Sequence, residues 1–272
     1  IMDRKLIFPK ITWNSRMLRN RQELDMTSEQ TKFKKWPVMA AGILGAFCVM
    51  LVLLITSVEA VAYWTPGYYE KEYTKYQVLE DLPEMTMEDL LTVTDEMMAY
   101  LRGDREDLHV FTTMGGEYRE FFNEREIAHM EDVRNLFIGG LWIRRISILI
   151  LAVLAVCFYL QGKKDPERRK FLKRMIPFSL CIGTGVFFAL ALMVGGIIST
   201  DFSKYFVVFH RIFFNNDLWI LDPATDMLIN IVPEPFFMDT ALRIGILFAV
   251  MTLLFLSGNF LLWKRSKAAG KR

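Results

Sequence analysis

Residues 37–63 read PVMAAGILGAFCVMLVLLITSVEAVAY, an apolar run in which Glu59 is the only charged residue. An α-helix needs about 20 predominantly apolar residues to cross a hydrocarbon layer about 30 Å thick. Three further apolar runs of similar length follow along the chain, at 136–160, 175–198 and 240–263. A soluble protein of 272 residues would not need four such runs. The sequence therefore predicts an all-α membrane protein with four transmembrane helices.

Basic residues are concentrated in three of the segments that flank these runs. Segment 1–36 carries nine Lys or Arg against four Asp or Glu, and segments 161–174 and 264–272 are basic as well. With four spans these three segments lie on one side, which the positive-inside rule makes cytoplasmic. Both termini are therefore expected in the cytoplasm. Nucleic-acid binding is the alternative explanation of the basic runs, but topology already accounts for them, so no nucleic-acid partner is expected.

The two remaining segments are then extracellular, and the first of them is acidic. Thr86 followed by a carboxylate three residues later predicts the start of a helix, and Gly103 closes it. Asn123 offers an N-cap to a second helix, which continues into the second span. Pro233 and Pro235 argue against a regular helix where the chain returns to the fourth span, so an interfacial loop is expected there. We expect a small, mainly helical extracellular cap.

The predicted organisation alternates between water and membrane. The four spans are 37–63, 136–160, 175–198 and 240–263. The cytoplasmic segments are the basic N-terminal segment 1–36, the loop 161–174 and the tail 264–272. The extracellular segments are the helical cap 64–135 and an aromatic segment 199–239. Four glycines in the third span are expected to let neighbouring helices approach closely: Gly183, Gly185, Gly195 and Gly196.

Two histidines are the candidate catalytic residues. His210 lies in the aromatic segment YFVVFHRIFFNNDLWILDP, residues 205–223, and aromatic rings suit the water–lipid boundary. An imidazole there is suited to acid–base chemistry on a lipid headgroup, although an interfacial polar residue is the simpler interpretation. His129 lies in the helix that begins after Asn123, one to two turns above the second span. We expect the fold to bring His129 and His210 together.

Carboxylates flank His129 at helical spacing. Glu126 and Asp132 lie three residues before and after it, on the same helix face, where a carboxylate can fix the tautomer of an imidazole. A surface helix of mixed charge has the same pattern. Glu126 and His129 also form half of a di-iron motif, but no second Glu-x-x-His exists, so no metal is expected. The third histidine, His109, is interpreted as a solvated loop residue.

Charged residues at the outer edge of the spans form a second candidate group: Glu59, Arg144, Arg145 and Arg243. They either staple the bundle as ion pairs or form a cradle in which guanidinium groups stabilise an oxyanion.

A covalent acyl-enzyme is hard to build on the outer side. Its only serines are Ser199 and Ser203, no Gly-x-Ser-x-Gly elbow occurs, and the three cysteines all lie inside predicted spans. If the site transfers acyl groups, direct transfer between parts of a bound substrate, without a cofactor, is the more economical scheme.

Two motifs resemble the lipoprotein intramolecular transacylase family of Gram-positive bacteria: REIAHMEDV at 125–133 and FHRIFFNNDLWILDP at 209–223. The likeness extends over the four-span layout. It implies a cell-membrane enzyme that acts on lipoproteins whose N-terminal cysteine carries a diacylglyceryl thioether. Such enzymes move one acyl chain from the glycerol to the cysteine α-amino group and leave a lyso-form lipoprotein. The resemblance implies that His129 and His210 are the catalytic histidines.

The mechanistic hypothesis assigns a role to each candidate. One histidine removes a proton from the amine, and the other, or an arginine, supports the oxyanion and delivers a proton to the leaving glycerol oxygen. The orienting residues would be Glu126 and Asp132 for His129, and Asn216 or Asp217 for His210. The substrate-binding candidates are Arg144, Arg145, Phe209 and Trp219.

Two other functions remain open at this stage. A non-catalytic membrane organising module would keep the two histidines far apart. A lipid or ester hydrolase at the outer leaflet would release free fatty acid instead of transferring it.

Overall fold

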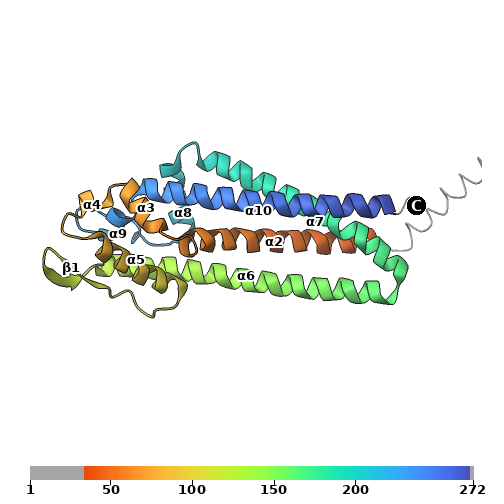
Figure 1. The fold of residues 1–272 in the computed structure, drawn as a ribbon, viewed down its shortest axis with the longest axis horizontal. Helices are drawn as coiled ribbons and strands as arrows, with labels where there is room; N and C mark the ends of the chain where they lie inside the picture. The colour runs from red at the N-terminus through yellow and green to blue at the C-terminus, as the bar shows by residue number, and fades with distance from the viewer. Residues whose placement is uncertain (1–33, 270–272) are drawn as a thin grey trace, which may run out of the picture.

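The computed structural model describes residues 34–269, so most of the basic N-terminal segment lies outside the described residues. Within that range four helices are long and apolar enough to cross a membrane. They run side by side along the longest axis of the molecule (Figure 1). This confirms the predicted all-α fold with four helices that suit a membrane. The four helices are α2 (Lys35–Tyr63), α6 (Glu124–Lys164), α7 (Pro166–Ile198) and α10 (Glu234–Ala269).

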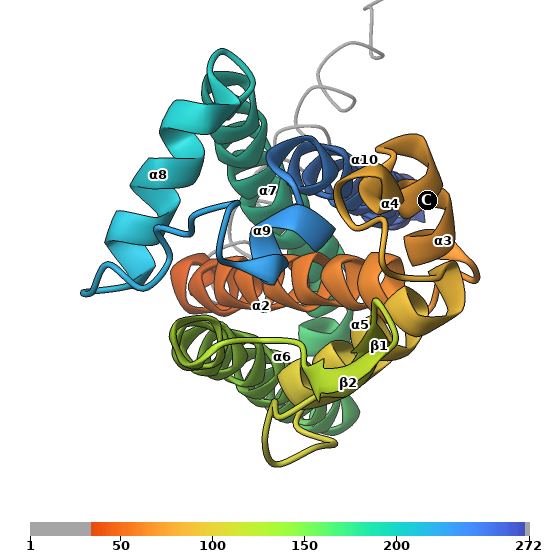
Figure 2. The ribbon, with the colours of Figure 1, turned by 90° about the vertical axis from the view of Figure 1, so that its left-hand side faces the viewer.

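The remaining elements form a cap at one end of this bundle (Figures 1 and 2). A compact apolar core joins most of these elements, with Leu90, Val93 and Ile231 fully buried. The two strands pair as an antiparallel hairpin, and the rest of the cap is helical, as predicted. The cap elements are α3 (Tyr68–Lys75), α4 (Val78–Asp81), α5 (Met87–Arg102), β1 (Phe111–Met114), β2 (Glu117–Glu120), α8 (Phe202–Phe213) and α9 (Met227–Ile231).

Capping residues set the ends of two helices that position the cap. The Thr86 side chain accepts a hydrogen bond from the backbone N–H of Asp89 at 3.1 Å, and Gly103 ends α5 with φ 88°. Asn123 and Glu126 form a reciprocal capping box at the start of α6. The predicted starts of both helices are confirmed. With 41 residues, α6 is about 60 Å long and extends well beyond a hydrocarbon layer of about 30 Å.

The start of α10 differs from the prediction. The helix begins at Glu234, so Pro235 lies in its first turn and no interfacial loop continues beyond it. Proline is tolerated there because the first backbone N–H groups of a helix have no intrahelical partner. Phe236, which follows, is buried in the cap against a set of α3 and neighbouring rings: Tyr68, Tyr69, Tyr73 and Tyr76.

A seam of small residues holds α2 against α7. A Cβ added to Gly183 would lie 2.6 Å from the Cβ of Ala46 and 3.2 Å from the backbone Cα of Ile43. A Cβ on Gly42, four residues before Ala46, would lie 1.9 Å from the Ser179 hydroxyl oxygen. Both helices therefore contribute a small-xxx-small pair, which permits close approach of the backbones. A Cβ added to any of the other three glycines of the third span would have no neighbour within 4 Å: Gly185, Gly195 and Gly196.

Candidate active site

The fold brings His129 and His210 together. His129 lies in the second turn of α6 and His210 lies near the end of α8. Their ring centroids are 6.0 Å apart, with the ring planes inclined by 36°. Both side chains are buried, at 6% and 7% exposure. The expected meeting of the two imidazoles is confirmed, and the wide separation expected for a non-catalytic module is not observed.

A backbone carbonyl fixes the orientation of His210. Its Nδ1 lies 2.7 Å from the carbonyl oxygen of Phe206, one helical turn earlier. Because a carbonyl can only accept, Nδ1 carries the proton and Nε2 keeps its lone pair in the neutral ring. The Trp219 ring stacks on the His210 ring, with centroids 5.0 Å apart. Burial lowers the pKa of His210 below its ordinary value of 6.5, and the hydrogen bond to Phe206 opposes that shift.

His129 has a different environment. Its Nδ1 is buried and has no hydrogen-bond partner among residues 34–269. A buried polar atom without a partner is costly, and each one calls for an explanation, of which a catalytic role is one. Phe214 packs edge-on against His129, with centroids 5.4 Å apart, and also contacts His210 at 5.6 Å. Phe214 was not predicted, because nothing in its spacing relates it to His129.

The expectation that Glu126 orients His129 is wrong. The Glu126 carboxylate is fully buried and accepts hydrogen bonds from the backbone N–H of Asn123 at 2.8 Å and of Leu228 at 2.5 Å. The first bond belongs to the capping box, and the second ties α6 to α9. Unpaired backbone donors at a helix start attract a carboxylate, so Glu126 points away from the imidazole.

Asp132 and Asn216 bind each other instead of the histidines. The Asn216 side-chain amide donates to Asp132 Oδ2 at 2.7 Å, and the Asn216 backbone carbonyl accepts from Trp219 Nε1 at 3.0 Å. The pair therefore holds the loop that carries Trp219, and with it the ring stacked on His210, against α6. Their predicted direct contacts with the imidazoles are not found, because each side chain is already engaged.

Asp217 also acts through its backbone. Its carbonyl oxygen accepts a hydrogen bond from Arg125 Nη2 at 2.5 Å, while its side chain makes no contact with His210. Nearby, the Asn123 amide donates to Asp226 at 2.7 Å. The start of α6 and the aromatic segment are thus linked at several points around the histidine pair. Arg125 was missed by sequence reasoning, although it belongs to the first quoted motif.

The outer arginines form two separate ion-pair groups. Arg144 pairs with the buried Glu59 of α2. Arg243 pairs with Glu72 at 2.6 Å and with Asp239 at 3.3 Å. Within residues 34–269 no hydrogen bond or ion pair connects Arg144 to a histidine. In this structure Arg144 and Arg243 therefore form ion pairs between neighbouring elements, the first of the two alternatives, and not an oxyanion cradle.

The predicted substrate-binding aromatics lie beside His210, while Arg145 does not. Arg145 is exposed, and its guanidinium lies over the Trp142 ring at 5.1 Å. Phe209 contacts His210 edge-on with centroids 5.6 Å apart, and Trp219 stacks on it. Phe209 shares an exposed apolar face of α8 with Ile212 and Phe213.

Neither of the two cavities in the described structure is lined by His129 or His210. Their volumes are about 700 and 310 Å³. The exposed apolar face of α8 is therefore the surface next to the histidines that suits acyl chains. Among residues 34–269 no group of three or more His, Cys, Asp or Glu could hold a metal ion.

Comparison with known proteins relates this chain and its fold to one family. The family model of the lipoprotein intramolecular transacylase Lit matches residues 43–237. A curated but uncharacterized protein of Aquifex aeolicus is 26% identical over 206 residues, which is 75% of this chain and 86% of that protein.

Two solved structures of the membrane-integral transacylase Lit from Bacillus cereus share the fold at 22% identity. The first gives a TM-score of 0.67 and covers 86% of this chain and 100% of that one. The second, in which one histidine is replaced by alanine, gives a TM-score of 0.64 and covers 88% of this chain and 99% of that one. Because the family match spans well over half of the sequence, the chain belongs to the lipoprotein intramolecular transacylase family.

Proposed function

We propose that this acyltransferase moves an acyl chain from the diacylglyceryl group to the α-amino group of the N-terminal cysteine of bacterial lipoproteins. The product is the lyso-form lipoprotein, and no covalent acyl-enzyme forms. The observation that carries the proposal is the pair of buried imidazoles, His129 and His210, 6.0 Å apart beside an apolar helix face. One group that accepts a proton and one that donates a hydrogen bond, both shielded from water, suit acyl transfer.

His210 is the general base of the proposed reaction. Its Nδ1–H is held by Phe206, so Nε2 is the available lone pair, and burial favours the neutral ring. The lipoprotein amine forms a C–N bond with the ester carbonyl carbon, and His210 takes one proton from that nitrogen. The Phe206 carbonyl supports the imidazolium that results.

His129 stabilises the intermediate. Its ring lacks a protein partner at Nδ1, which leaves the imidazole available to donate a hydrogen bond to the oxyanion of the tetrahedral intermediate. When the intermediate collapses, the bond between the carbonyl carbon and the glycerol oxygen breaks. The proton held by His210 then passes to the glycerol oxygen, so one proton moves from nitrogen to oxygen overall.

Geometry supplies much of the remaining rate enhancement. Amine and ester belong to the same substrate, and well-oriented intramolecular reactions reach effective molarities of about 10⁵–10⁸ M. The contacts of Asp132 with Asn216, and of Arg125 with Asp217, keep α6 and the aromatic segment in register. These residues are positioning residues. Phe209 and Trp219 bind the lipid part of the substrate on either side of His210.

The active site is assigned to the extracellular face. The basic segments 161–174 and 264–269 lie at the end of the bundle opposite the histidines (Figure 1). The positive-inside rule makes that end cytoplasmic, together with both termini. The membrane-spanning parts are then 37–63, 136–160, 175–198 and 240–263, within the long helices. The substrate is a membrane-anchored lipoprotein, so it reaches the site from the outer leaflet.

Single replacement of each histidine tests the proposal. Purified enzyme in lipid vesicles is incubated with a diacylglyceryl lipoprotein, and its N-terminus is analysed by mass spectrometry. His129→Ala and His210→Ala are expected to lower the rate of N-acylated lyso product by at least about 10²-fold, since each removes a group that acts on the reacting atoms.

His109→Ala is the matched control, because His109 is exposed, lies just before the cap hairpin and pairs with Glu120. It is expected to react at the wild-type rate. Normal product from a membrane-inserted His129→Ala or His210→Ala enzyme would refute the assignment. Release of free fatty acid without N-acylation would indicate a hydrolase.

A further inference from the structure

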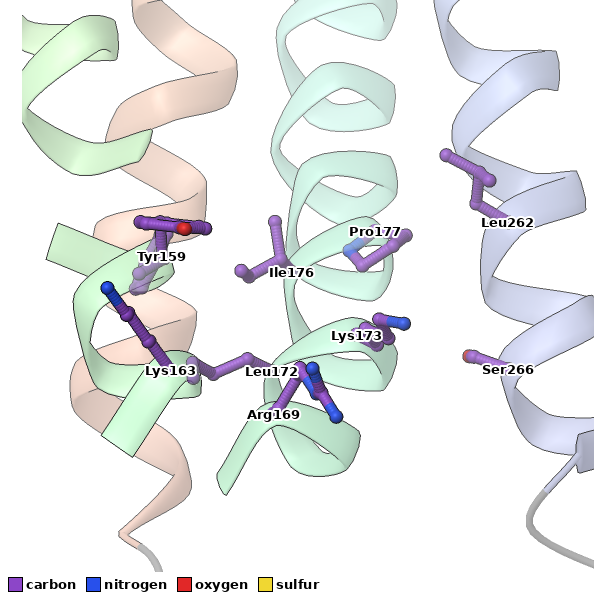
Figure 3. Close-up of a pocket in the computed structure, with 11 residues that line it drawn as sticks. Tyr159, Lys163, Arg169, Leu172, Lys173, Ile176, Pro177, Leu262 and Ser266 are labelled. Carbon is purple, nitrogen blue, oxygen red and sulfur yellow. The ribbon is translucent and has the colours of Figure 1, made fainter. Parts of the chain in front are cut away.

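The bundle carries a second potential site at its other end. A groove of about 700 Å³ lies between α6, α7 and α10. Figure 3 shows the residues of the three helices that converge on it. The proposed reaction does not use this groove. Its lining includes three cations at the bundle end: Lys163, Arg169 and Lys173.

The lining changes from charged to apolar along the helix axes. Lys163 is next to the last residue of α6, and Arg169 and Lys173 lie in the first turns of α7. Tyr159 and Ile176 lie one or more turns further into the bundle and line the same groove (Figure 3). A molecule that fills the groove would therefore meet positive charge at the end of the bundle and hydrocarbon deeper in it.

Within residues 34–269 the three cations have no compensating acid. No ion pair within residues 34–269 involves Lys163, Arg169 or Lys173, and the lining contains no carboxylate. The two acids nearest in sequence are engaged elsewhere. Asp165 accepts from the first backbone N–H groups of α7, and Glu167 pairs with Lys170. The groove therefore presents positive charge to whatever occupies it.

Close packing shapes the groove floor. A Cβ on Gly162 would lie 3.3 Å from the Cβ of Arg169, so the absence of a side chain on α6 lets the Arg169 stem cross it. Leu172, also in the lining, is buried at the same place. Arg169 is thus anchored by its stem while its charged head remains exposed.

We propose that this groove binds one anionic phospholipid. The phosphate lies among Lys163, Arg169 and Lys173, and one acyl chain follows Tyr159 and Ile176 into the bundle. Basic pockets between transmembrane helices on the cytoplasmic side suit such headgroups. The chain's own segment 1–33 carries a net positive charge, which makes it a poor occupant of a positive groove.

Native mass spectrometry of the full-length enzyme in detergent tests the proposal. Phosphatidylglycerol and phosphatidylcholine with identical acyl chains are titrated separately. Wild-type enzyme is expected to retain phosphatidylglycerol in preference to phosphatidylcholine. The variant Lys163→Gln/Arg169→Gln/Lys173→Gln is expected to bind phosphatidylglycerol more than tenfold less tightly.

The control removes the same number of charges at the same end, outside the groove: Lys164→Gln/Arg174→Gln/Lys264→Gln. It is expected to bind phosphatidylglycerol like the wild type. Equal loss in both triple variants would overturn the proposal, because it would reduce the effect to general surface charge. Displacement of the lipid by millimolar inorganic phosphate would also overturn it, since a free phosphate site needs no acyl contact.

A single substitution at an exposed position tests the proposal even if the triple variant misfolds. Lys163→Glu reverses one charge at the groove mouth and is expected to weaken phosphatidylglycerol binding severalfold at an unchanged melting temperature. Unchanged binding would contradict the proposal. The catalytic assignment is tested separately, since lipoprotein turnover by His129 and His210 takes place at the other end of the bundle.

Discussion

At the scale of single residues, His210 illustrates how one hydrogen bond sets a chemical role. The four-residue spacing of Phe206 and His210 is visible in the sequence, but it becomes meaningful only once both lie in α8. The carbonyl of Phe206 then accepts from Nδ1 and leaves Nε2 as the acceptor. In contrast, Glu126 stands at the favourable spacing from His129 and does not use it, because backbone donors compete for the carboxylate.

The pH dependence of turnover follows from the environment of His210. Burial lowers its pKa, so the neutral ring persists below pH 6.5. We expect protonation of His210 to lower kcat only when the pH drops through this lowered pKa, since the protonated ring cannot accept the amine proton. Protonation of the substrate α-amine lowers kcat separately, at higher pH. The measurement is a kcat profile from about pH 4.5 to 8 in lipid vesicles. An acid limb of the enzyme at or above pH 6.5, distinct from that of the substrate α-amine, would contradict the role of His210 as the base.

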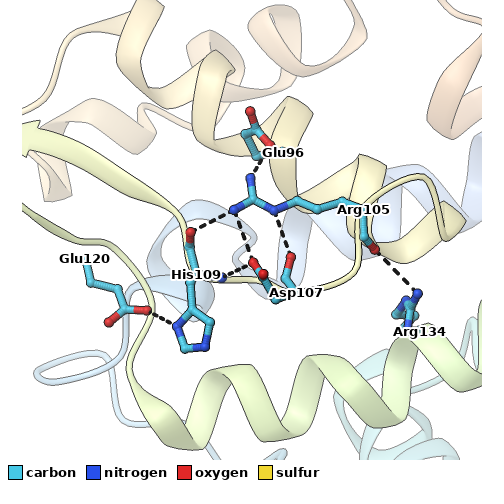
Figure 4. A network of polar contacts seen from close by, with 6 residues as sticks. All are labelled: Glu96, Arg105, Asp107, His109, Glu120 and Arg134. Carbon is cyan, nitrogen blue, oxygen red and sulfur yellow. Dashed lines mark hydrogen bonds and ion pairs between the residues drawn. The ribbon is translucent and has the colours of Figure 1, made fainter.

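His109 provides the control for that profile. Its Nδ1 lies 2.5 Å from Glu120, and this hydrogen bond raises the pKa of His109 (Figure 4). Stability from that pair is fully present below pH 6.5 and is lost as the pH rises through the raised pKa. The pH dependence is opposite for His210: the stability that its neutral ring contributes to the fold is present above pH 6.5 and is lost as the pH falls through the lowered pKa. His109→Ala should therefore leave the acid limb of kcat unchanged.

At the scale of secondary-structure elements, the sequence predicted what local chemistry determines. Thr86, Gly103 and Asn123 are found at the predicted helix ends, because caps act within one turn. Helix α8 was not predicted, since its aromatic run was interpreted only as an interfacial segment. The start of α10 was wrong, because the prediction treated Pro235 as a helix breaker without allowing for the tolerance of the first turn.

The ion pair between α2 and α6 tests whether Arg144 binds substrate or staples helices. Removing one partner leaves a buried charge unpaired, which costs about 3–5 kcal/mol, whereas neutralising both is often nearly neutral. Arg144→Gln is therefore expected to lower the melting temperature markedly. The double variant Glu59→Gln/Arg144→Gln should recover most of the stability and the transacylation rate.

Two measurements separate the roles of Arg144, namely thermal unfolding in detergent and product formation by mass spectrometry. Arg145→Gln is the control, because Arg145 is exposed and contacts only the Trp142 ring in the described structure. A double variant that is stable but inactive would mean that Arg144 contacts the substrate, as the cradle hypothesis held.

At the scale of the whole molecule, the proposed active site and the proposed lipid-binding groove lie at opposite ends of the bundle. The histidine pair lies at the cap end of the bundle, and the basic groove lies at the opposite end. Composition was sufficient to predict the four helices, since hydrocarbon thickness fixes the length of an apolar run. The contact between His129 and His210 depends on how α6 and α8 pack through the cap. Nothing local in the sequence determines that packing, so their meeting could be stated only as a hypothesis.

The α2–α7 seam tests the packing on which this arrangement depends. Gly183 faces Ala46 and the backbone of Ile43, while a methyl group added to Gly185, two residues later on the same helix, would have no atom of another residue within 4 Å. Gly183→Ala should push α7 away from α2 and destabilise the fold by about 1–3 kcal/mol, the usual cost of overpacking. Gly185→Ala should be neutral or slightly stabilising, because alanine is the better helix former. Thermal unfolding of both variants in the same detergent makes the comparison, and equal melting temperatures would contradict the seam as the close contact of the bundle.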